Sequence, residues 1–120
     1  MLLTIGLTGI HLEGFVGCLP EERINPVSIE LDINMSVATE ITDSQDSDKL
    51  ENTLDYRLVL GEMKKTIKSR HFTTIENLSA VLGTNIFRMD SRIIRLKLRL
   101  KKLGVLPNGV VPWVETEVER

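Results

Sequence analysis

The sequence predicts an α+β fold in which a four-stranded antiparallel sheet carries two helices on one face. Four segments alternate apolar and polar residues with the period of two that is typical of half-buried strands. Two consecutive segments between them repeat apolar residues with the helical period. The resulting β-β-α-α-β-β order favours an antiparallel sheet with its helices on one side. The chain has 120 residues, enough for one domain with a real core, which we predict to span residues 1–120.

The first two strands are predicted at residues 3–12 and 27–37. The apolar alternation of the first strand shifts phase near residues 8–9, which indicates a β-bulge. The second strand alternates strictly and is the clearest element of the sequence. Residues 14–23 join the two strands and contain two glycines and a proline. This connection is longer than a tight hairpin, and long connections often carry functional residues.

The two helices follow a polar, acidic connection at residues 39–52. The first helix is predicted to begin with Asp55 or Thr53 as its N-cap. Thr73 and Glu76 have the spacing of a capping box at the start of the second helix. The apolar stripe of the first helix comprises Tyr56, Val59, Leu60, Met63 and Ile67, and that of the second comprises Ile75, Leu78, Leu82 and Ile86.

The last two strands are predicted at residues 94–101 and 110–118, separated by a turn rich in glycine and proline. One face of the third strand carries only Arg and Lys, and the fourth strand offers Glu. Opposite charges on neighbouring strands can pair directly. Two free sheet edges invite pairing with other chains, so we expect a homo-oligomer that covers them.

Composition excludes several classes of function. The net charge is −2, which gives no reason to expect a nucleic-acid partner or an acidic membrane surface. No apolar run is long enough to span a membrane, and the first ten residues read as a strand and not as a signal peptide. One cysteine allows no internal disulfide, which suits a cytoplasmic location. One Cys and two His cannot build a Cys/His zinc site within one chain.

Five residues at the ends of elements could do chemistry, and each also has a purely structural explanation. A carboxylate in a turn is usually solvated, a tyrosine on an apolar stripe usually packs in the core, and a capping glutamate needs no further role. The five candidates are Glu21, Glu22, Tyr56, Glu76 and Lys101. Neither His11 nor His71 has a partner signature, and we interpret both as structural. Cys18 has no base beside it in sequence, and we expect a small, at least half-buried residue.

Four motifs in order resemble the dihydroneopterin aldolase family over essentially the whole chain. They read G-F-V-G-C-L-P-E-E, L-D-Y, T-T-I-E-N-L and K-K-L-G-V-L-P. The resemblance implies the tunnelling fold (T-fold), with tetrameric rings around a charged tunnel that commonly stack into octamers. It also implies retro-aldol cleavage of 7,8-dihydroneopterin, a step of folate biosynthesis, without a metal, Schiff base or other cofactor. The products are 6-hydroxymethyl-7,8-dihydropterin and glycolaldehyde.

The resemblance also implies roles for individual residues. Glu76 matches the carboxylate that accepts two hydrogen bonds from the pterin edge. Lys101 matches the catalytic lysine of the family, which acts through a bound water molecule. Tyr56 matches the tyrosine that a neighbouring subunit contributes across the interface. Glu22 matches the glutamate near the side-chain hydroxyls of the substrate, with Glu21 as its substitute. Backbone groups that line the pterin slot are implied near Leu19, Leu54 and Ile75.

Two departures from the family pattern keep alternatives open. Val16 stands where many aldolases have histidine, and Val27 where many have glutamine. At the first of these positions, the sequence is similar to dihydroneopterin triphosphate 2′-epimerase. This enzyme shares the retro-aldol step but rejoins the fragments. A basic pocket for the triphosphate would distinguish this alternative. A non-catalytic, pterin-binding member of the same fold is an alternative of another class.

Overall fold

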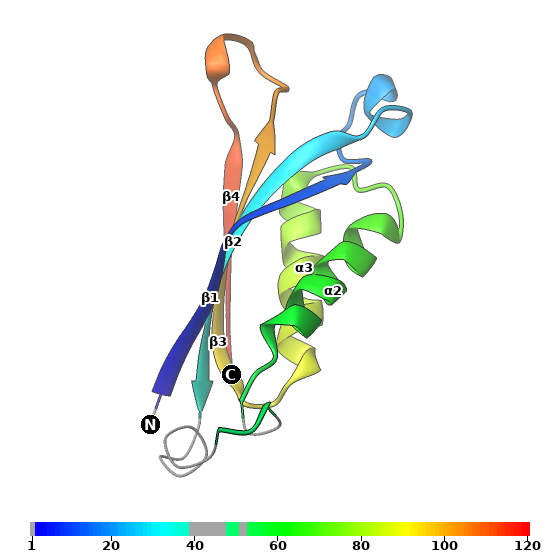
Figure 1. The fold of residues 1–120 in the computed structure, drawn as a ribbon. Helices are drawn as coiled ribbons and strands as arrows, with labels where there is room; N and C mark the ends of the chain where they lie inside the picture. The colour runs from blue at the N-terminus through cyan, green and yellow to red at the C-terminus, as the bar shows by residue number, and fades with distance from the viewer. Residues whose placement is uncertain (1, 39–47, 51–52) are drawn as a thin grey trace.

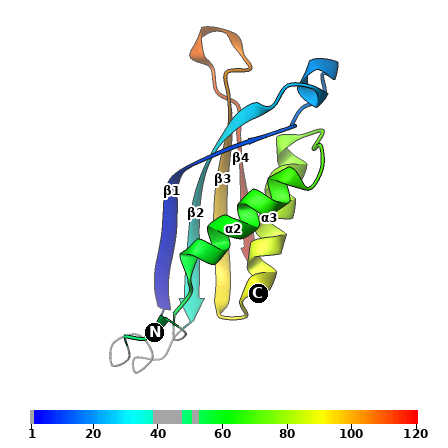
Figure 2. The same ribbon diagram turned by 45° about the vertical axis from the view of Figure 1, so that its right-hand side comes forward.

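The computed structural model describes residues 2–38, 48–50 and 53–120 and confirms the expected fold class. The strands β1 (Leu2–Gly14), β2 (Val27–Ala38), β3 (Ile93–Leu103) and β4 (Trp113–Glu119) form one antiparallel sheet in the order β1-β2-β3-β4. Two helices, α2 (Tyr56–Lys68) and α3 (Ile75–Met89), lie side by side on one face of this sheet (Figures 1 and 2). Most of the predicted connection at 39–52 lies outside the described residues.

The predicted bulge is present in β1. The pairing of β1 with β2 shifts register between Leu7 and Ile10, and Gly9 adopts a φ of 69°, a conformation that favours glycine. The Gly9 N–H donates to Oδ1 of Asp32 at 2.8 Å, which satisfies a backbone group that the bulge takes out of the ladder. Beyond the bulge, β1 bends towards the helices (Figure 1). Its last residue, Gly14, reaches α2, where an added Cβ would lie 2.5 Å from Cγ1 of Ile67.

The core lies between the sheet and the two helices. Alternate residues of β2 and β3 point towards the helices and are fully or almost fully buried, as the period of a pleated strand requires. The helices contribute the other half of the core from the apolar stripes predicted above. The fully buried members are Ile29, Leu31, Ile33, Met35, Leu96, Leu98, Leu100, Val59, Met63, Leu78, Leu82 and Ile86. No helix in the described part of the chain is long and apolar enough to cross a membrane.

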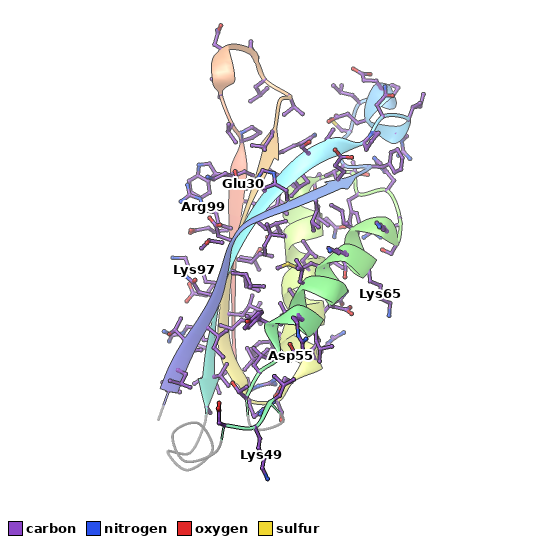
Figure 3. All side chains as sticks on the ribbon, in the orientation of Figure 1. Glu30, Lys49, Asp55, Lys65, Lys97 and Arg99 are labelled. Atoms are coloured by element: carbon purple, nitrogen blue, oxygen red, sulfur yellow. The ribbon has the colours of Figure 1, made fainter. Side chains whose placement is uncertain are left out.

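The opposite sheet face, here called the outer face, is charged as expected. Lys97 and Glu115 approach to 3.9 Å, and Arg95 hydrogen-bonds Glu119 at 3.0 Å. The guanidinium of Arg99 lies 3.9 Å from the ring centre of Trp113. Figure 3 shows Glu30, Lys97 and Arg99 on this side of the sheet. The strands β1 and β4 form the two open edges of the sheet.

The helix starts confirm one prediction and correct another. Asp55 caps α2 by accepting a hydrogen bond from the backbone N–H of Arg57 at 3.0 Å. The N-cap of α3 is Thr74, whose hydroxyl accepts from the N–H of Asn77 at 3.1 Å. The predicted capping box of Thr73 with Glu76 is therefore wrong by one residue. Since Asn77 occupies the third helical position, the carboxylate of Glu76 is not needed for a capping box.

Candidate active site

The long connection after β1 is attached to the connection between the two helices. The Gly17 N–H donates to the carbonyl of Phe72 at 2.8 Å, and the Phe72 N–H donates to the carbonyl of Phe15 at 2.9 Å. These bonds form a short parallel bridge in which Val16 and Phe72 are completely buried. The bridge fixes the backbone from which the next functional residues project.

A short 3₁₀-helix, η1 (Pro20–Arg23), directs Glu22 towards the interior of the protein. The residue is only 8% exposed, whereas Glu21 beside it is exposed. The backbone N–H of Leu19 donates to Oε1 of Glu22 at 3.2 Å. Of the two candidate glutamates in this turn, the structure therefore brings Glu22 into a protected position.

Gly17 leaves the space that the carboxylate of Glu22 occupies. A Cβ at this position would lie 2.1 Å from Cδ of Glu22, much closer than atoms can approach. The φ of Gly17 is 147°, a backbone conformation that other L-residues rarely adopt. Position 17 therefore requires glycine both for its conformation and for its contact with Glu22.

Lys102 pairs with Glu22. Its ammonium group and Oε2 of Glu22 form a short ion pair, and the two side chains are only 13% and 10% exposed. The hydrogen bond from Lys102 lowers the pKa of Glu22, although burial acts in the opposite direction. The Leu19 N–H and the charges of Lys102 and His71 lower this pKa further. The site thus holds a carboxylate and an ammonium in contact, with little access to water.

The expected lysine, Lys101, does not line the pocket over this ion pair, whereas its neighbour Lys102 does. Lys101 pairs with Glu30 on the outer face, whereas Lys102 pairs with Ile29, which is completely buried on the helix side. Successive residues of a strand point to opposite faces, so adjacent lysines cannot share one site. The inward alternation of β3 continues from Leu100 to Lys102, and this signal was available in the sequence.

A pocket of about 380 Å³ opens over the ion pair. Its volume lies within the roughly 300–1,000 Å³ typical of small-molecule sites. The side chain of Glu76 is exposed at this pocket, and Leu19 and Ile75 contribute apolar surface. The structure thus brings four predicted residues together. The lining consists of Gly17, Cys18, Leu19, Glu22, Thr73, Thr74, Ile75, Glu76, Lys102, Val105, Leu106 and Pro112. Contrary to expectation, Cys18 is exposed.

Leu54 and Tyr56 do not reach this pocket. They line a separate depression at the start of α2, and Tyr56 is 54% exposed. The start of α2 and η1 lie at opposite ends of the molecule (Figure 1). Asp55, which stands between Leu54 and Tyr56 in the sequence, is labelled in Figure 3. Within one chain, the predicted site is therefore divided into two separate halves.

Sequence reasoning missed one more residue near the ion pair. Nε2 of His71 lies 2.8 Å from the carbonyl oxygen of Gly17, although 54 positions separate the two residues. No sequence spacing indicates this contact, because it depends on how β1 bends over the helices. Within residues 2–38, 48–50 and 53–120, no group of three or more His, Cys, Asp or Glu side chains could hold a metal ion.

The four-stranded antiparallel sheet, its two helices and its charged outer face define a protein of the tunnelling fold. Two solved structures share this fold over nearly their whole length. A candidate dihydroneopterin aldolase of Vibrio cholerae matches with a TM-score of 0.88 at 21% identity, covering 98% of this chain and 97% of the other. Escherichia coli dihydroneopterin aldolase in complex with neopterin matches with a TM-score of 0.84 at 15% identity, covering 96% and 97%.

Sequence comparison narrows this class to one family. The family profile described as "FolB: Dihydroneopterin aldolase" matches residues 5–119. The dihydroneopterin aldolase of Streptococcus pyogenes serotype M1 is 27% identical over 120 residues, which cover 97% of this chain and 96% of the relative. The chain belongs to the dihydroneopterin aldolase family. Membership of this family supports dihydroneopterin aldolase function, which is a lyase activity.

Proposed function

We propose that the chain cleaves 7,8-dihydroneopterin into 6-hydroxymethyl-7,8-dihydropterin and glycolaldehyde at the pocket over Glu22 and Lys102. The carbon–carbon bond between C1′ and C2′ of the side chain breaks. The proton of the 2′-hydroxyl leaves to a base, and C2′ becomes the aldehyde carbon of glycolaldehyde. The electron pair moves into the dihydropterin ring, and a proton then adds at C1′. The single observation that carries this proposal is the protected Glu22–Lys102 ion pair.

Glu76 anchors the pterin ring in this proposal. A pterin presents an amino group and a ring N–H side by side, and a carboxylate can accept both hydrogen bonds. Glu76 lines the same pocket as the ion pair, at the start of α3, where helix capping does not require it. Leu19 and Ile75 provide the apolar walls for the ring.

Lys102 takes the role that the sequence suggested for Lys101. A lysine held by a carboxylate is positioned to exchange protons with the substrate, directly or through a water molecule. Glu22 keeps the ammonium group in place and lies where the side-chain hydroxyls of the substrate would enter. Because Glu22 has a lowered pKa, it remains a carboxylate at neutral pH and can accept hydrogen bonds from those hydroxyls.

A second copy of the chain completes the site. Tyr56 and Leu54 lie too far from the pocket to act on a substrate bound there, as their place in the fold indicates (Figure 1). The two open sheet edges provide surfaces through which copies can join. We propose a ring of subunits in which Tyr56 of one copy faces the Glu22–Lys102 pocket of the next, with two rings stacked as an octamer. A cytoplasmic location is part of the same proposal and suits the free thiol of Cys18.

The charge of the pocket favours dihydroneopterin over its triphosphate. Its charged lining from this chain is two carboxylates, Glu22 and Glu76, and the ammonium of Lys102, which pairs with Glu22. Such a lining suits an uncharged pterin better than a polyanion. Val16, whose identity suggested an epimerase, is fully buried and does not line this pocket.

The decisive experiment is incubation of the purified protein with 7,8-dihydroneopterin, followed by chromatographic resolution of the pterin products. We expect mainly 6-hydroxymethyl-7,8-dihydropterin together with an equal amount of glycolaldehyde. If the main product is the 2′-epimer, the chain is an epimerase and not an aldolase. Binding without any product would indicate the non-catalytic alternative. A Lys102→Ala variant serves as the control that assigns turnover to this pocket.

A further inference from the structure

The connection between α2 and α3 supports the site through a residue that the proposed reaction does not use. His71 is half-buried, and its Nε2 lies 2.8 Å from the carbonyl oxygen of Gly17. A carbonyl oxygen can only accept, so Nε2 carries the hydrogen of this bond. The side chain of His71 and the backbone carbonyl of Phe72 therefore bind both polar groups of Gly17, since the Gly17 N–H donates to Phe72 at 2.8 Å.

The position of Gly17 determines where the carboxylate of Glu22 can lie. The two residues are in such close contact that no Cβ fits between them. Glu22 is also held by its ion pair with Lys102 and by the hydrogen bond from the Leu19 N–H of its own turn. A displacement of the Gly17 peptide would therefore move Glu22 relative to Lys102.

We propose that His71 is a positioning residue of this active site, which fixes the Gly17 peptide and thereby holds the Glu22 carboxylate against Lys102. This inference rests on the proposed function of the pocket. His71 contacts no part of the space where the substrate would bind, and it does not belong to the pocket lining. Its effect on turnover is therefore indirect, through the geometry of the ion pair.

The charges around Glu22 agree with this arrangement. The groups that act on its carboxylate are Lys102 from β3, the Leu19 N–H from its own turn and His71 from the helix connection. The neighbouring Arg70 donates to the carbonyl of His71 at 2.9 Å, and its guanidinium lies 3.9 Å from the ring centre of Phe72. A Coulombic interaction with His71 also lowers the pKa of Glu22, to a lesser degree than the hydrogen bonds from Lys102 and the Leu19 N–H.

Two substitutions that differ by one methylene group test the inference. In His71→Gln, the side-chain amide can still reach the carbonyl of Gly17, whereas in His71→Asn the donor is too short. We expect kcat to fall about 10- to 100-fold in His71→Asn, because small misplacements of catalytic groups cost this much. KM should stay within about threefold, because Glu76 still binds the ring. His71→Gln should recover most of kcat.

His11→Gln is the matched control, because His11 is the other histidine of the chain and lies on the outer face opposite Glu30. It should behave as wild type. A wild-type kcat in His71→Asn, or an equal loss in His71→Gln, would overturn the positioning role.

A second measurement separates this inference from the proposed function. Carboxyl-carbon NMR follows the pKa of Glu22. This pKa should rise in His71→Gln, because the Coulombic interaction with His71 is lost, and should rise further in His71→Asn, because the carboxylate is then also no longer held against Lys102. It should not change in His11→Gln. If the wild-type protein has no turnover, the proposed function fails, and the NMR titration alone decides on His71. Equal Glu22 pKa values in His71→Asn and His71→Gln would then overturn the inference.

Discussion

The two halves of the divided site differ in how far one chain completes them. At the end near η1, Glu22 and Lys102 contact each other, are almost excluded from water and lie at the base of a pocket. At the opposite end, Tyr56 stands at the start of α2 with more than half of its surface exposed. In the proposed function, the end near η1 carries out proton transfer through its own contacts, and the end with Tyr56 supplies a group to the next copy.

The exposed end is nevertheless built to hold its backbone in place. The guanidinium of Arg92 donates to the carbonyl of Thr53 at 3.1 Å and also pairs with Asp90. Asp55 caps α2 and binds the guanidinium of Arg57 at 3.1 Å. These contacts position the backbone on both sides of Leu54 and the base of Tyr56. An exposed side chain on a fixed backbone is suited to insertion into the pocket of a second copy.

The largest expected effect is a difference in kcat between variants of the two adjacent lysines of β3. Lys102→Ala should lower kcat about 10³-fold, because it removes the proposed proton-transfer group. Lys101→Ala should leave kcat within about threefold, because Lys101 lies on the outer face. Steady-state kinetics with 7,8-dihydroneopterin measures both. A larger loss in Lys101→Ala would return the catalytic role to the lysine that the sequence suggested, and a comparable loss in both variants would contradict the assignment to Lys102 alone.

Mixed assemblies test whether the two ends meet between subunits. Tyr56→Phe should lower kcat about 10²-fold by removing the phenol proton. In the proposed ring, each interface joins different surfaces of two subunits, so Tyr56 and Lys102 of one site belong to different copies. Co-refolding equal amounts of Tyr56→Phe and Lys102→Ala should then restore about a quarter of wild-type activity, because about a quarter of the sites receive both intact residues. Activity no higher than the average of the two variants would place both residues in one chain's site.

A smaller effect is expected for the pterin anchor. Glu76→Gln keeps the size of the side chain but replaces one acceptor oxygen by a donor, so neopterin should bind about 10- to 100-fold more weakly, as the loss of a hydrogen bond to a charged group implies. Isothermal titration calorimetry measures the change in Kd. Glu21→Gln is the matched control, because Glu21 is exposed in the neighbouring turn. Equal affinities of the two variants would remove Glu76 from the site.

How much of this molecule the sequence predicts depends on the range of the interactions involved. Strand and helix periods are local, so the sheet, the two helices and the bulge in β1 follow from residue patterns. The pleat of β3 is also local and could have distinguished Lys102 from Lys101 by counting onward from the buried Leu100. The contact of His71 with Gly17 is different, because it joins residues 54 positions apart through a bend of β1 over the helices. Residue patterns contain no signal for such a contact.

The smallest predicted effect concerns the contribution of Glu22, at the end near η1, to the pH dependence of stability. The folded-state pKa of Glu22 is lowered, chiefly by the hydrogen bond from Lys102. The stabilisation that Glu22 provides is therefore fully present above its unfolded pKa of about 4.3. This stabilisation is lost as the pH falls through the folded-state pKa. Glu22→Gln should therefore lower the free energy of unfolding by about 1 kcal/mol at pH 7, and this difference should shrink below about pH 4. Urea unfolding at several pH values and one fixed protein concentration measures it, with Glu21→Gln as the control. A difference that stays constant down to pH 3 would mean that Glu22 stabilises the fold by packing and not by its charge.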